Sequence, residues 1–132
     1  MTHNPVPWFE IYVQDIERAK RFYESVLQVK LEKLNAPIGE MWAFPMDIDH
    51  FGAGGSLVRM KGVASGGNSV LVYFACEDCA VEAARIVEAG GTIRQDKMSI
   101  GEHGFIVIAT DSEGNSFGLH SMPANRQAGG GA

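Results

Sequence analysis

The sequence has little that would direct it to a membrane, to nucleic acid or to an oxidising compartment. It contains 11 Lys and Arg against 16 Asp and Glu, a formal net charge of −5, whereas a phosphate backbone binds a basic surface. No apolar run reaches the roughly 20 residues that span a bilayer. The first residues also lack the basic segment and apolar stretch of a signal peptide. We therefore expect a cytoplasmic protein with no membrane and no nucleic-acid partner.

Cysteine is scarce as well, and two cysteines cannot build a disulfide scaffold. Both lie in one CxxC motif, Cys76 and Cys79, at an expected strand-to-helix junction, a context that redox dithiols use. The two intervening residues are acidic, which opposes thiolate formation. No second CxxC or close histidine pair completes a zinc site. We expect two free thiols, with a redox pair as the alternative.

What the sequence does contain is an internal repeat. Residues 8–27, WFEIYVQDIERAKRFYESVL, are typical of a strand, an Asp and then an amphipathic helix. Residues 71–90, LVYFACEDCAVEAARIVEAG, follow the same order 63 positions later, since 71 is 8 plus 63. The offset aligns Asp15 with Asp78, and Asp is a favourable helix N-cap. A fixed internal period constrains the fold before any single residue does.

Strand patterns follow each copy of the repeat. The Gly-rich stretch 62–68 separates two modules, about 5–61 and 69–122, and residues 123–132 are expected to form a disordered tail. The order predicts an α+β fold of two βαβββ modules, whose curved mixed sheets form an open, cup-like barrel with the helices outside. The expected strands cover residues 6–13, 29–34, 41–46, 56–60, 69–76, 92–97, 105–110 and 116–121.

Three motifs carry a family resemblance: FEIYVQDIERAKRFYESVL, FACEDCAVEAARIVEAGG and IATDSEGNSFGLH. They resemble those of the vicinal oxygen chelate (VOC) superfamily, which includes glyoxalases, bleomycin-resistance proteins and extradiol dioxygenases. The resemblance covers roughly residues 5–122, and the last motif is similar to the small bacterial glyoxalase-like branch. It implies one VOC domain, a homodimer and a ligand cavity inside the cup.

The resemblance also implies where a divalent metal would bind. Metal enzymes of the superfamily take His, Gln or Glu ligands from the first, fourth, fifth and eighth strands. By position these ligands fall at Trp8, near Val58, at Leu71 and at Gly118, and none of these residue types is a metal ligand. We therefore predict no metal and no other cofactor, with a shifted ligand set as the alternative.

Two polar residues lie close to those positions on the same strand faces. Side chains two apart in a strand share a face, so Glu10 accompanies Trp8 and His120 accompanies Gly118. A Glu and His pair can act as general acid and base, or bind a metal with a third partner. We predict Glu10 and His120 as catalytic residues. The alternative is that Glu10 accepts structural hydrogen bonds and His120 is a satisfied interior histidine.

Further candidates are aromatic or basic. Trp8, Trp42, Phe44 and Tyr73 lie on expected strands and could form an apolar ligand pocket; ordinary core packing is the alternative for each. Arg59 on the fourth strand could clamp a ligand carboxylate through its guanidinium group, or lie on the surface. We predict these five residues as ligand-binding.

Two further histidines lie in expected loops. His50 follows Asp47 and Asp49 in the segment MDIDHFG, and this spacing matches no metal-binding pattern. Glu102 and His103 precede the seventh expected strand. We expect both groups to lie on solvated surface loops.

The function that these residues indicate is binding of a small organic molecule in the cup, without the usual metal. One alternative is a divalent-metal-dependent lyase or isomerase, similar to lactoylglutathione lyase, with a shifted ligand set. The other is a drug-sequestering protein, because an aromatic and acidic cavity suits a planar cation.

Overall fold

The structure is a computed structural model that describes residues 4–37, 39–47, 49–50, 52–67 and 69–123. The chain divides into two compact units, Met1–Ser65 and Gly66–Ala132, here called module 1 and module 2. The division falls inside the Gly-rich stretch 62–68 that the sequence predicts as a linker. Residues 124–132 of the predicted tail lie outside the described residues. No described helix has the length and apolar character needed to cross a bilayer.

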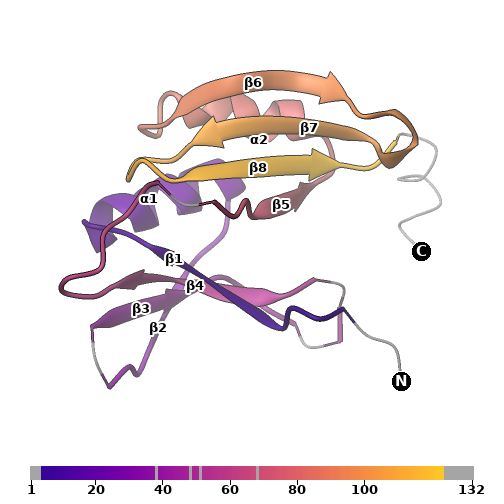
Figure 1. Ribbon diagram of the computed structural model, residues 1–132. Helices are drawn as coiled ribbons and strands as arrows, with labels where there is room; N and C mark the ends of the chain where they lie inside the picture. Colours follow the sequence, from indigo (N-terminus) through magenta and orange to yellow (C-terminus); the bar gives the residue numbers. More distant parts are fainter. Residues whose placement is uncertain (1–3, 38, 48, 51, 68, 124–132) are drawn as a thin grey trace. The chain divides into compact units, whose positions relative to one another are not determined.

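Module 1 contains a four-stranded sheet in the order β1-β4-β3-β2 (Figure 1). Strands β1 and β4 run parallel, and the other neighbours are antiparallel. A two-residue hairpin cannot join parallel strands, so the chain reaches β4 only after the helix and two intervening strands. The elements are β1 (Trp8–Tyr12), α1 (Ile16–Leu27), β2 (Glu32–Leu34), β3 (Glu40–Ala43) and β4 (Gly54–Arg59).

Module 2 repeats this topology, with the sheet order β5-β8-β7-β6 and a parallel β5–β8 pair. Strand β6 extends beyond the predicted residue 97, because its pairing with β7 continues to its last residue through two register shifts. The elements are β5 (Tyr73–Cys76), α2 (Cys79–Ile86), β6 (Thr92–Ser99), a short 3-10 helix η1 (Gly101–His103), β7 (Phe105–Thr110) and β8 (Ser116–Ser121). The predicted α+β fold of two βαβββ modules is therefore confirmed.

Aspartates begin both helices, as the repeat predicts. The Asp15 carboxylate accepts a hydrogen bond from the Arg18 amide at 3.1 Å, and the Asp78 carboxylate accepts one from the Ala80 amide at 3.0 Å. Each bond satisfies a backbone donor that the first turn of a helix would leave without a partner. Helix α1 ends at Leu27 and is followed by the C-cap residue Gln28, which adopts the left-handed region with φ 55°.

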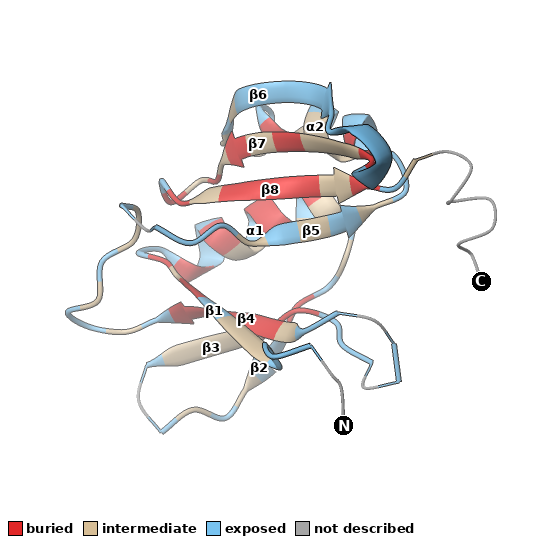
Figure 2. Ribbon diagram, turned by 45° about the vertical axis from the view of Figure 1, so that its right-hand side comes forward, coloured by how far each residue is buried: buried red, intermediate tan, exposed pale blue. Residues whose placement is uncertain are grey.

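Each helix covers one face of the sheet in its own module. In module 1 the Tyr23 ring of α1 meets the Phe44 ring edge-on, with centroids 5.5 Å apart. In module 2 the buried α2 residues Cys79 and Ile86 face the sheet. Figure 2 shows the buried segments in α1, β4, β7 and β8, while β5 and β6 are largely exposed. The fully buried large side chains include Phe22, Tyr23, Leu57, Val107, Phe117 and Leu119.

Candidate functional site

Three side chains of β1 lie on the sheet face that α1 does not cover. The Phe9 ring contacts the Phe44 ring, with centroids 5.7 Å apart, and Phe44 in turn contacts α1. Because side chains alternate along a strand, Trp8, Glu10 and Tyr12 lie on the opposite face. The Glu10 carboxylate accepts the Tyr12 hydroxyl at 2.7 Å and the Trp8 indole N–H at 3.3 Å. The predicted shared face of Trp8 and Glu10 is thus present, and both Glu10 oxygens already have protein donors.

This carboxylate changes the acidity of its neighbour. The hydrogen bond that the Tyr12 hydroxyl donates to Glu10 raises the pKa of Tyr12, and desolvation and repulsion from the carboxylate add to the effect. The hydroxyl therefore remains a hydrogen-bond donor at neutral pH. Its role is to hold Glu10 rather than to act as a base.

A cavity of about 680 Å³ opens beside Trp8 at the start of β1 and β4. Two of its walls approach Gly54 closely, since a Cβ there would lie 3.1 Å from the Met46 sulfur and 3.3 Å from the Trp8 ring. The indole and the thioether therefore both lie beside a glycine backbone. We call this the Trp8 cavity. It is lined by Pro7, Trp8, Pro45, Met46, Asp47, His50, Gly52, Ala53 and Gly54.

The Trp8 cavity includes a His and Asp pair that the sequence assigned only to a solvated loop. The His50 Nδ1 lies 2.7 Å from an Asp47 carboxylate oxygen, and both side chains are exposed. A carboxylate accepts, so Nδ1 carries the proton and Nε2 of the neutral ring is an acceptor. In the sequence, the only signal for this pair is the three-residue spacing of Asp47 and His50. Such a spacing does not predict that the two residues line a cavity.

Two of the predicted ligand-binding aromatics lie on the other face of the module 1 sheet. The Lys20 ammonium of α1 lies 3.7 Å from the centroid of the Trp42 ring. Phe44 is buried among rings that include Tyr23 and Phe9. These contacts place Trp42 and Phe44 against α1, away from the face that carries Trp8. The structure does not bring them together with Trp8 or Glu10.

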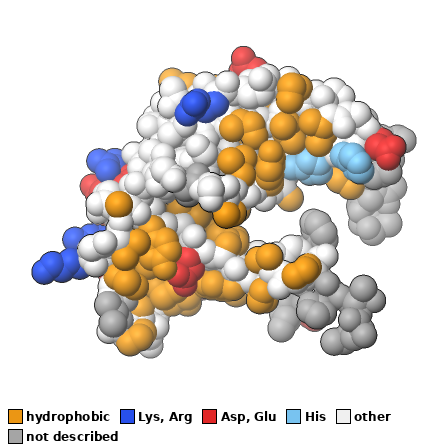
Figure 3. All heavy atoms as spheres, viewed as in Figure 1, with side chains coloured by type: hydrophobic (Ala, Val, Ile, Leu, Met, Phe, Trp, Pro, Cys, Tyr) orange, Lys and Arg blue, Asp and Glu red, His pale blue; other side chains and the backbone are white. Residues whose placement is uncertain are grey.

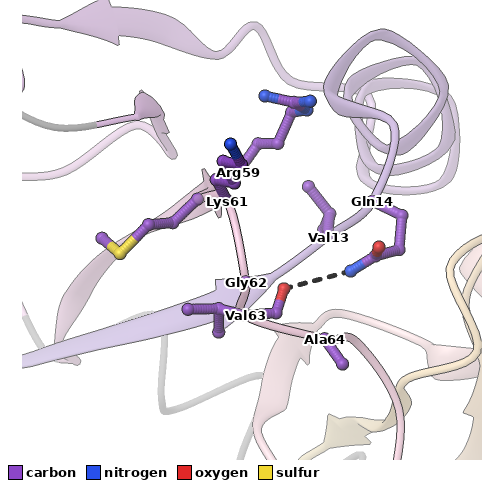
Figure 4. A pocket seen from close by; sticks show the side chains of 8 residues that line it. Val13, Gln14, Arg59, Lys61, Gly62, Val63 and Ala64 are labelled. Atoms are coloured by element: carbon purple, nitrogen blue, oxygen red, sulfur yellow. Dashed lines mark hydrogen bonds between the residues drawn. The ribbon is translucent and has the colours of Figure 1, made fainter.

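Arg59 lines a second cavity of about 420 Å³ in module 1, called here the Arg59 cavity (Figure 4). Arg59 ends β4, and its register partner on β3 is Glu40. The Gln14 side-chain amide donates to the Val63 carbonyl at 3.1 Å across this cavity. The lining residues are Val13, Gln14, Arg59, Met60, Lys61, Gly62, Val63 and Ala64.

Tyr73 lies on the face of the module 2 sheet opposite α2. Its ring covers Gly118, its register partner on β8, so closely that a Cβ at that position would collide with it. Tyr73 is 46% exposed. Figure 3 shows hydrophobic side chains gathered over the module 2 strands, with histidine side chains beside them. Tyr73 is thus partly exposed on this face of the sheet.

His120 lies on the same face, opposite Ala75 and Ile106 in the strand register. Its Nε2 is 2.7 Å from the His103 carbonyl oxygen. Because a carbonyl only accepts, Nε2 carries the proton, and Nδ1 of the neutral ring is an acceptor. Glu10 and His120 belong to different modules, and their action as a catalytic pair stays a prediction.

The CxxC motif has the properties of two free thiols. Burial raises the pKa of Cys76 to about 12, and the nearby Glu82 carboxylate adds to the increase. Cys79 is fully buried at the start of α2. A reactive dithiol needs a lowered thiol pKa, so these properties favour the free-thiol expectation over the redox alternative.

The four positions that the family resemblance implies for metal ligands do not fit a divalent ion. Trp8 and Leu71 supply no competent donor, and the Tyr73 ring occupies the space beside Gly118 where a ligand side chain would begin. On β4 the implied position falls near Val58, whose side chain carries no donor. Ser56, the register partner of Glu10, is a buried residue whose hydroxyl has no hydrogen-bond partner among the described residues. Zinc and similar ions require three or four converging N, O or S donors.

Two βαβββ modules, each with a parallel pair of first and last strands, define a two-module α+β protein of the VOC type. A family model described as the Glyoxalase/Bleomycin resistance protein/Dioxygenase superfamily matches residues 6–119. The chain belongs to this superfamily. A search of curated proteins gave no match.

Solved structures agree on the fold at low sequence identity. TnmS3, an antibiotic binding protein from Streptomyces sp. CB03234, is 23% identical with a TM-score of 0.67, over 93% of this chain and 99% of that one. A glyoxylase/bleomycin resistance protein/dioxygenase domain from Frankia sp. EAN1pec is 15% identical with a TM-score of 0.70, over 92% and 100%. Glyoxalase I from Zea mays is 22% identical with a TM-score of 0.69, over 89% of this chain and 46% of that one.

Proposed function

We propose that this protein binds a small organic molecule with a flat apolar portion in the Trp8 cavity, and does so without a metal ion. The observation that carries the proposal is that the Trp8 ring and the Met46 sulfur both approach the Gly54 backbone, where any larger residue would intrude. An indole held by a hydrogen bond to Glu10 is a pre-oriented stacking surface. A thioether adapts to ligands of irregular shape.

The size and charge of the cavity support this class of ligand. Its volume of about 680 Å³ lies within the range of small-molecule sites, about 300 to 1,000 Å³. Asp47 adds a carboxylate to the lining, and aromatic faces attract cations, so a planar cation suits the cavity best. The fold similarity to an antibiotic binding protein supports a binding role of the same kind.

A metal-dependent lyase or isomerase is less well supported. It would need a shifted ligand set, and no group of three or more His, Cys, Asp or Glu side chains converges among the described residues. Trp8, Leu71 and Gly118, at the positions where the superfamily's metal enzymes hold ligands, also lack side chains that bind a divalent ion. Metal analysis of the purified protein is the direct test, and a stoichiometric divalent ion would overturn the metal-free proposal.

A fluorescence titration with proflavine, a planar aromatic cation, tests the binding proposal. The variant Trp42→Phe leaves Trp8 as the only tryptophan, so quenching reports directly on the cavity. We expect saturable quenching, and a loss of affinity of about tenfold or more with Gly54→Val, because the new side chain would displace the Trp8 ring and the Met46 sulfur that line the cavity. Gly101→Val is the control, since Gly101 lines neither cavity and a Cβ there meets nothing within 4 Å. Equal affinity in the Gly54 and Gly101 variants would overturn the proposal.

The folding of the control variant must be checked before the affinities are compared. Gly101 has φ +82°, so any side chain there strains the backbone. The melting temperature of both variants is therefore measured first, and affinities are compared at a temperature where both are folded. A second control, Trp8→Ala in the unchanged background, should abolish the rise in melting temperature that proflavine causes in the parent protein.

His120 supports a second candidate function, general acid–base catalysis on a ligand at the module 2 sheet face. Its Nε2–H bond to the His103 carbonyl leaves Nδ1 as a base. Substitution His120→Gln should abolish any pH-dependent turnover found, whereas His103→Gln keeps the backbone carbonyl and should retain it. Equal turnover in the two variants would exclude this role. Glu10 as its partner, the homodimer and a cytoplasmic location stay predictions.

A further inference from the structure

The two cavities of module 1 lie at opposite ends of one strand. Gly54, the first residue of β4, lines the Trp8 cavity, and Arg59, the last, lines the Arg59 cavity. The two linings share no residue. Five strand steps of about 3.3 Å separate the two backbone positions by roughly 16 Å. Arg59 therefore cannot clamp a ligand in the Trp8 cavity, and a ligand-binding role for it requires a separate site.

Among the described residues, the cations of the Arg59 cavity have no carboxylate partner. Neither Arg59 nor Lys61 forms an ion pair with any residue in the described part of the chain. The acidic groups on neighbouring elements are Glu40, Asp15 and Glu17. Glu40 is opposite Arg59 in the strand register but is not paired with it.

The two other acidic groups already have partners. The Asp15 carboxylate caps α1 by accepting the Arg18 amide. The Glu17 carboxylate lies 3.7 Å from the Lys20 ammonium. The whole chain has a net charge of −5, yet Arg59 and Lys61 line one cavity with no ion-pair partner among the described residues. Both cations are therefore available to an anion from solution.

The remaining walls of the cavity combine apolar side chains with polar groups that already have partners. Val13 is 1% exposed and forms a rigid wall. The Val63 amide donates to the Met60 carbonyl at 3.1 Å, and the Val63 carbonyl accepts the Gln14 amide at 3.1 Å, so both backbone groups of the turn are satisfied. Figure 4 shows Arg59 extending away from this turn, with Val13 and Gln14 across from it. Cations therefore line the same cavity as the apolar side chains of Val13 and Val63.

We propose that the Arg59 cavity is a second ligand site, selective for a small organic carboxylate with a compact apolar body. The Arg59 guanidinium matches a carboxylate in a two-point geometry, and Lys61 adds a flexible positive charge. The apolar body contacts Val13 and Val63. The cavity volume of about 420 Å³ is sufficient for a molecule of one aromatic ring. This site involves none of the residues that line the Trp8 cavity.

The probes that test this site are sodium benzoate and its neutral analogue benzamide, added to the full chain labelled with ¹⁵N at constant ionic strength. Benzoate should shift the Gln14 side-chain amide and the Val63 backbone amide saturably, and benzamide should not. Equal shifts with both probes, or shifts that never saturate, would overturn the carboxylate assignment. Benzoate shifts confined to residues 52–54 would overturn the assignment of the site.

A pair of double variants separates a built site from general charge. Arg59→Gln with Lys61→Gln should weaken benzoate binding about tenfold or more, since it removes both charge-assisted contacts. Lys30→Gln with Lys33→Gln removes the same charge from exposed positions of module 1 and should leave the affinity within about twofold. If both double variants weakened benzoate binding equally, the net charge of the protein would explain the binding, and the proposal would be wrong. The proflavine titration is independent of either result.

Discussion

The parallel strand pairs of the two modules have the same register but present different chemistry. In module 1 the pair β1–β4 places Glu10 opposite Ser56, and in module 2 the pair β5–β8 places Tyr73 opposite Gly118. Tyr73 is 63 positions after Glu10, so the two pairs are equivalent in the repeat. Module 1 therefore has a carboxylate opposite a hydroxyl at the position where module 2 has a phenol ring over a glycine.

The comparison teaches that the repeat preserves the backbone and leaves the side chains free to diverge. Strand register is set by which residues face each helix, and a slip of one residue would expose that whole face. Side chains on the opposite face carry no such constraint. His120 has Val58 as its equivalent in module 1, since Tyr12 pairs with Val58 and Ala75 pairs with His120. Each module therefore offers a different candidate site.

Core truncation should test whether the two helix-covered faces are equally important. Phe22 in α1 and Phe117 in β8 are each 1% exposed, and replacing either by Ala removes a buried ring and leaves a cavity. We expect each variant to lose about 3–5 kcal/mol of unfolding free energy, measured by urea titration with circular dichroism. A loss below about 1 kcal/mol in one variant would show that the modules are not equivalent.

The helix caps should reveal an asymmetry between the modules. Asp15→Ala should cost about 1 kcal/mol, the usual value for a lost cap. Asp78→Ala should cost more, because Asp78 also pairs with the Lys97 ammonium at 2.9 Å. Urea titrations of the two variants at pH 7 measure the difference, and an equal cost would mean that the Lys97 pair contributes nothing.

The same pair predicts a pH dependence for module 2. The hydrogen bond from Lys97 holds the pKa of Asp78 below its ordinary value. A carboxyl with a lowered folded-state pKa adds stability above its unfolded pKa of about 3.9, and that stability is lost as the pH falls through the folded value. The gap in stability between the parent and Asp78→Ala should therefore close below about pH 4. A gap that persists at pH 2 would contradict this account.

Cys76 should distinguish the modules at alkaline pH, because Val13 occupies its equivalent position. The folded-state pKa of Cys76 is raised from 9.0 to about 12, so the unfolded chain loses this proton first. The associated stability is present below about pH 9 and is lost as the pH rises from there to about 12. Cys76→Val should reduce the loss measured between pH 8 and pH 10.5. An unchanged loss would assign it to other groups.

The smallest expected effect concerns the ends of the repeat. Gln28 has φ 55°, a region that favours glycine, and in module 2 the positive-φ residue after α2 is Gly90, one position before the repeat equivalent Gly91. Gln28→Gly should raise the unfolding free energy by about 0.5 kcal/mol, because relief of backbone strain exceeds the lost bond from its side chain to the Ser25 carbonyl. Thermal denaturation measures the change. A lower melting temperature would show that the side-chain bond dominates.

Much of this architecture was predictable from the sequence because the repeat is a local signal. Asp15 and Asp78 mark both helix starts, and alternation correctly places Trp8 and Glu10 on one face of β1. The face that α1 covers was not predictable for β3, since alternation groups Trp42 with Phe44 without saying which side they occupy. That depends on the long-range pairing of β3 with β4.

The cavities were harder to predict, because they arise where loops meet strand ends. Met46 and His50 reach the Trp8 cavity from the segment after β3, and no periodic pattern describes such a segment. Arg59 was identified as a carboxylate clamp from its residue type alone. Its distance from Trp8 became evident only from the register that puts Gly54 and Arg59 at opposite ends of β4.

Strand β4 also limits how this protein can change. Its first and last residues, Gly54 and Arg59, each line one of the two cavities, while Leu57 between them is buried in the core against α1. Deleting or inserting one residue in β4 would turn every later side chain to the other face. The number of residues between the two cavities is therefore fixed. A new ligand preference at either cavity must arise by substitution of lining residues rather than by a change in the length of β4.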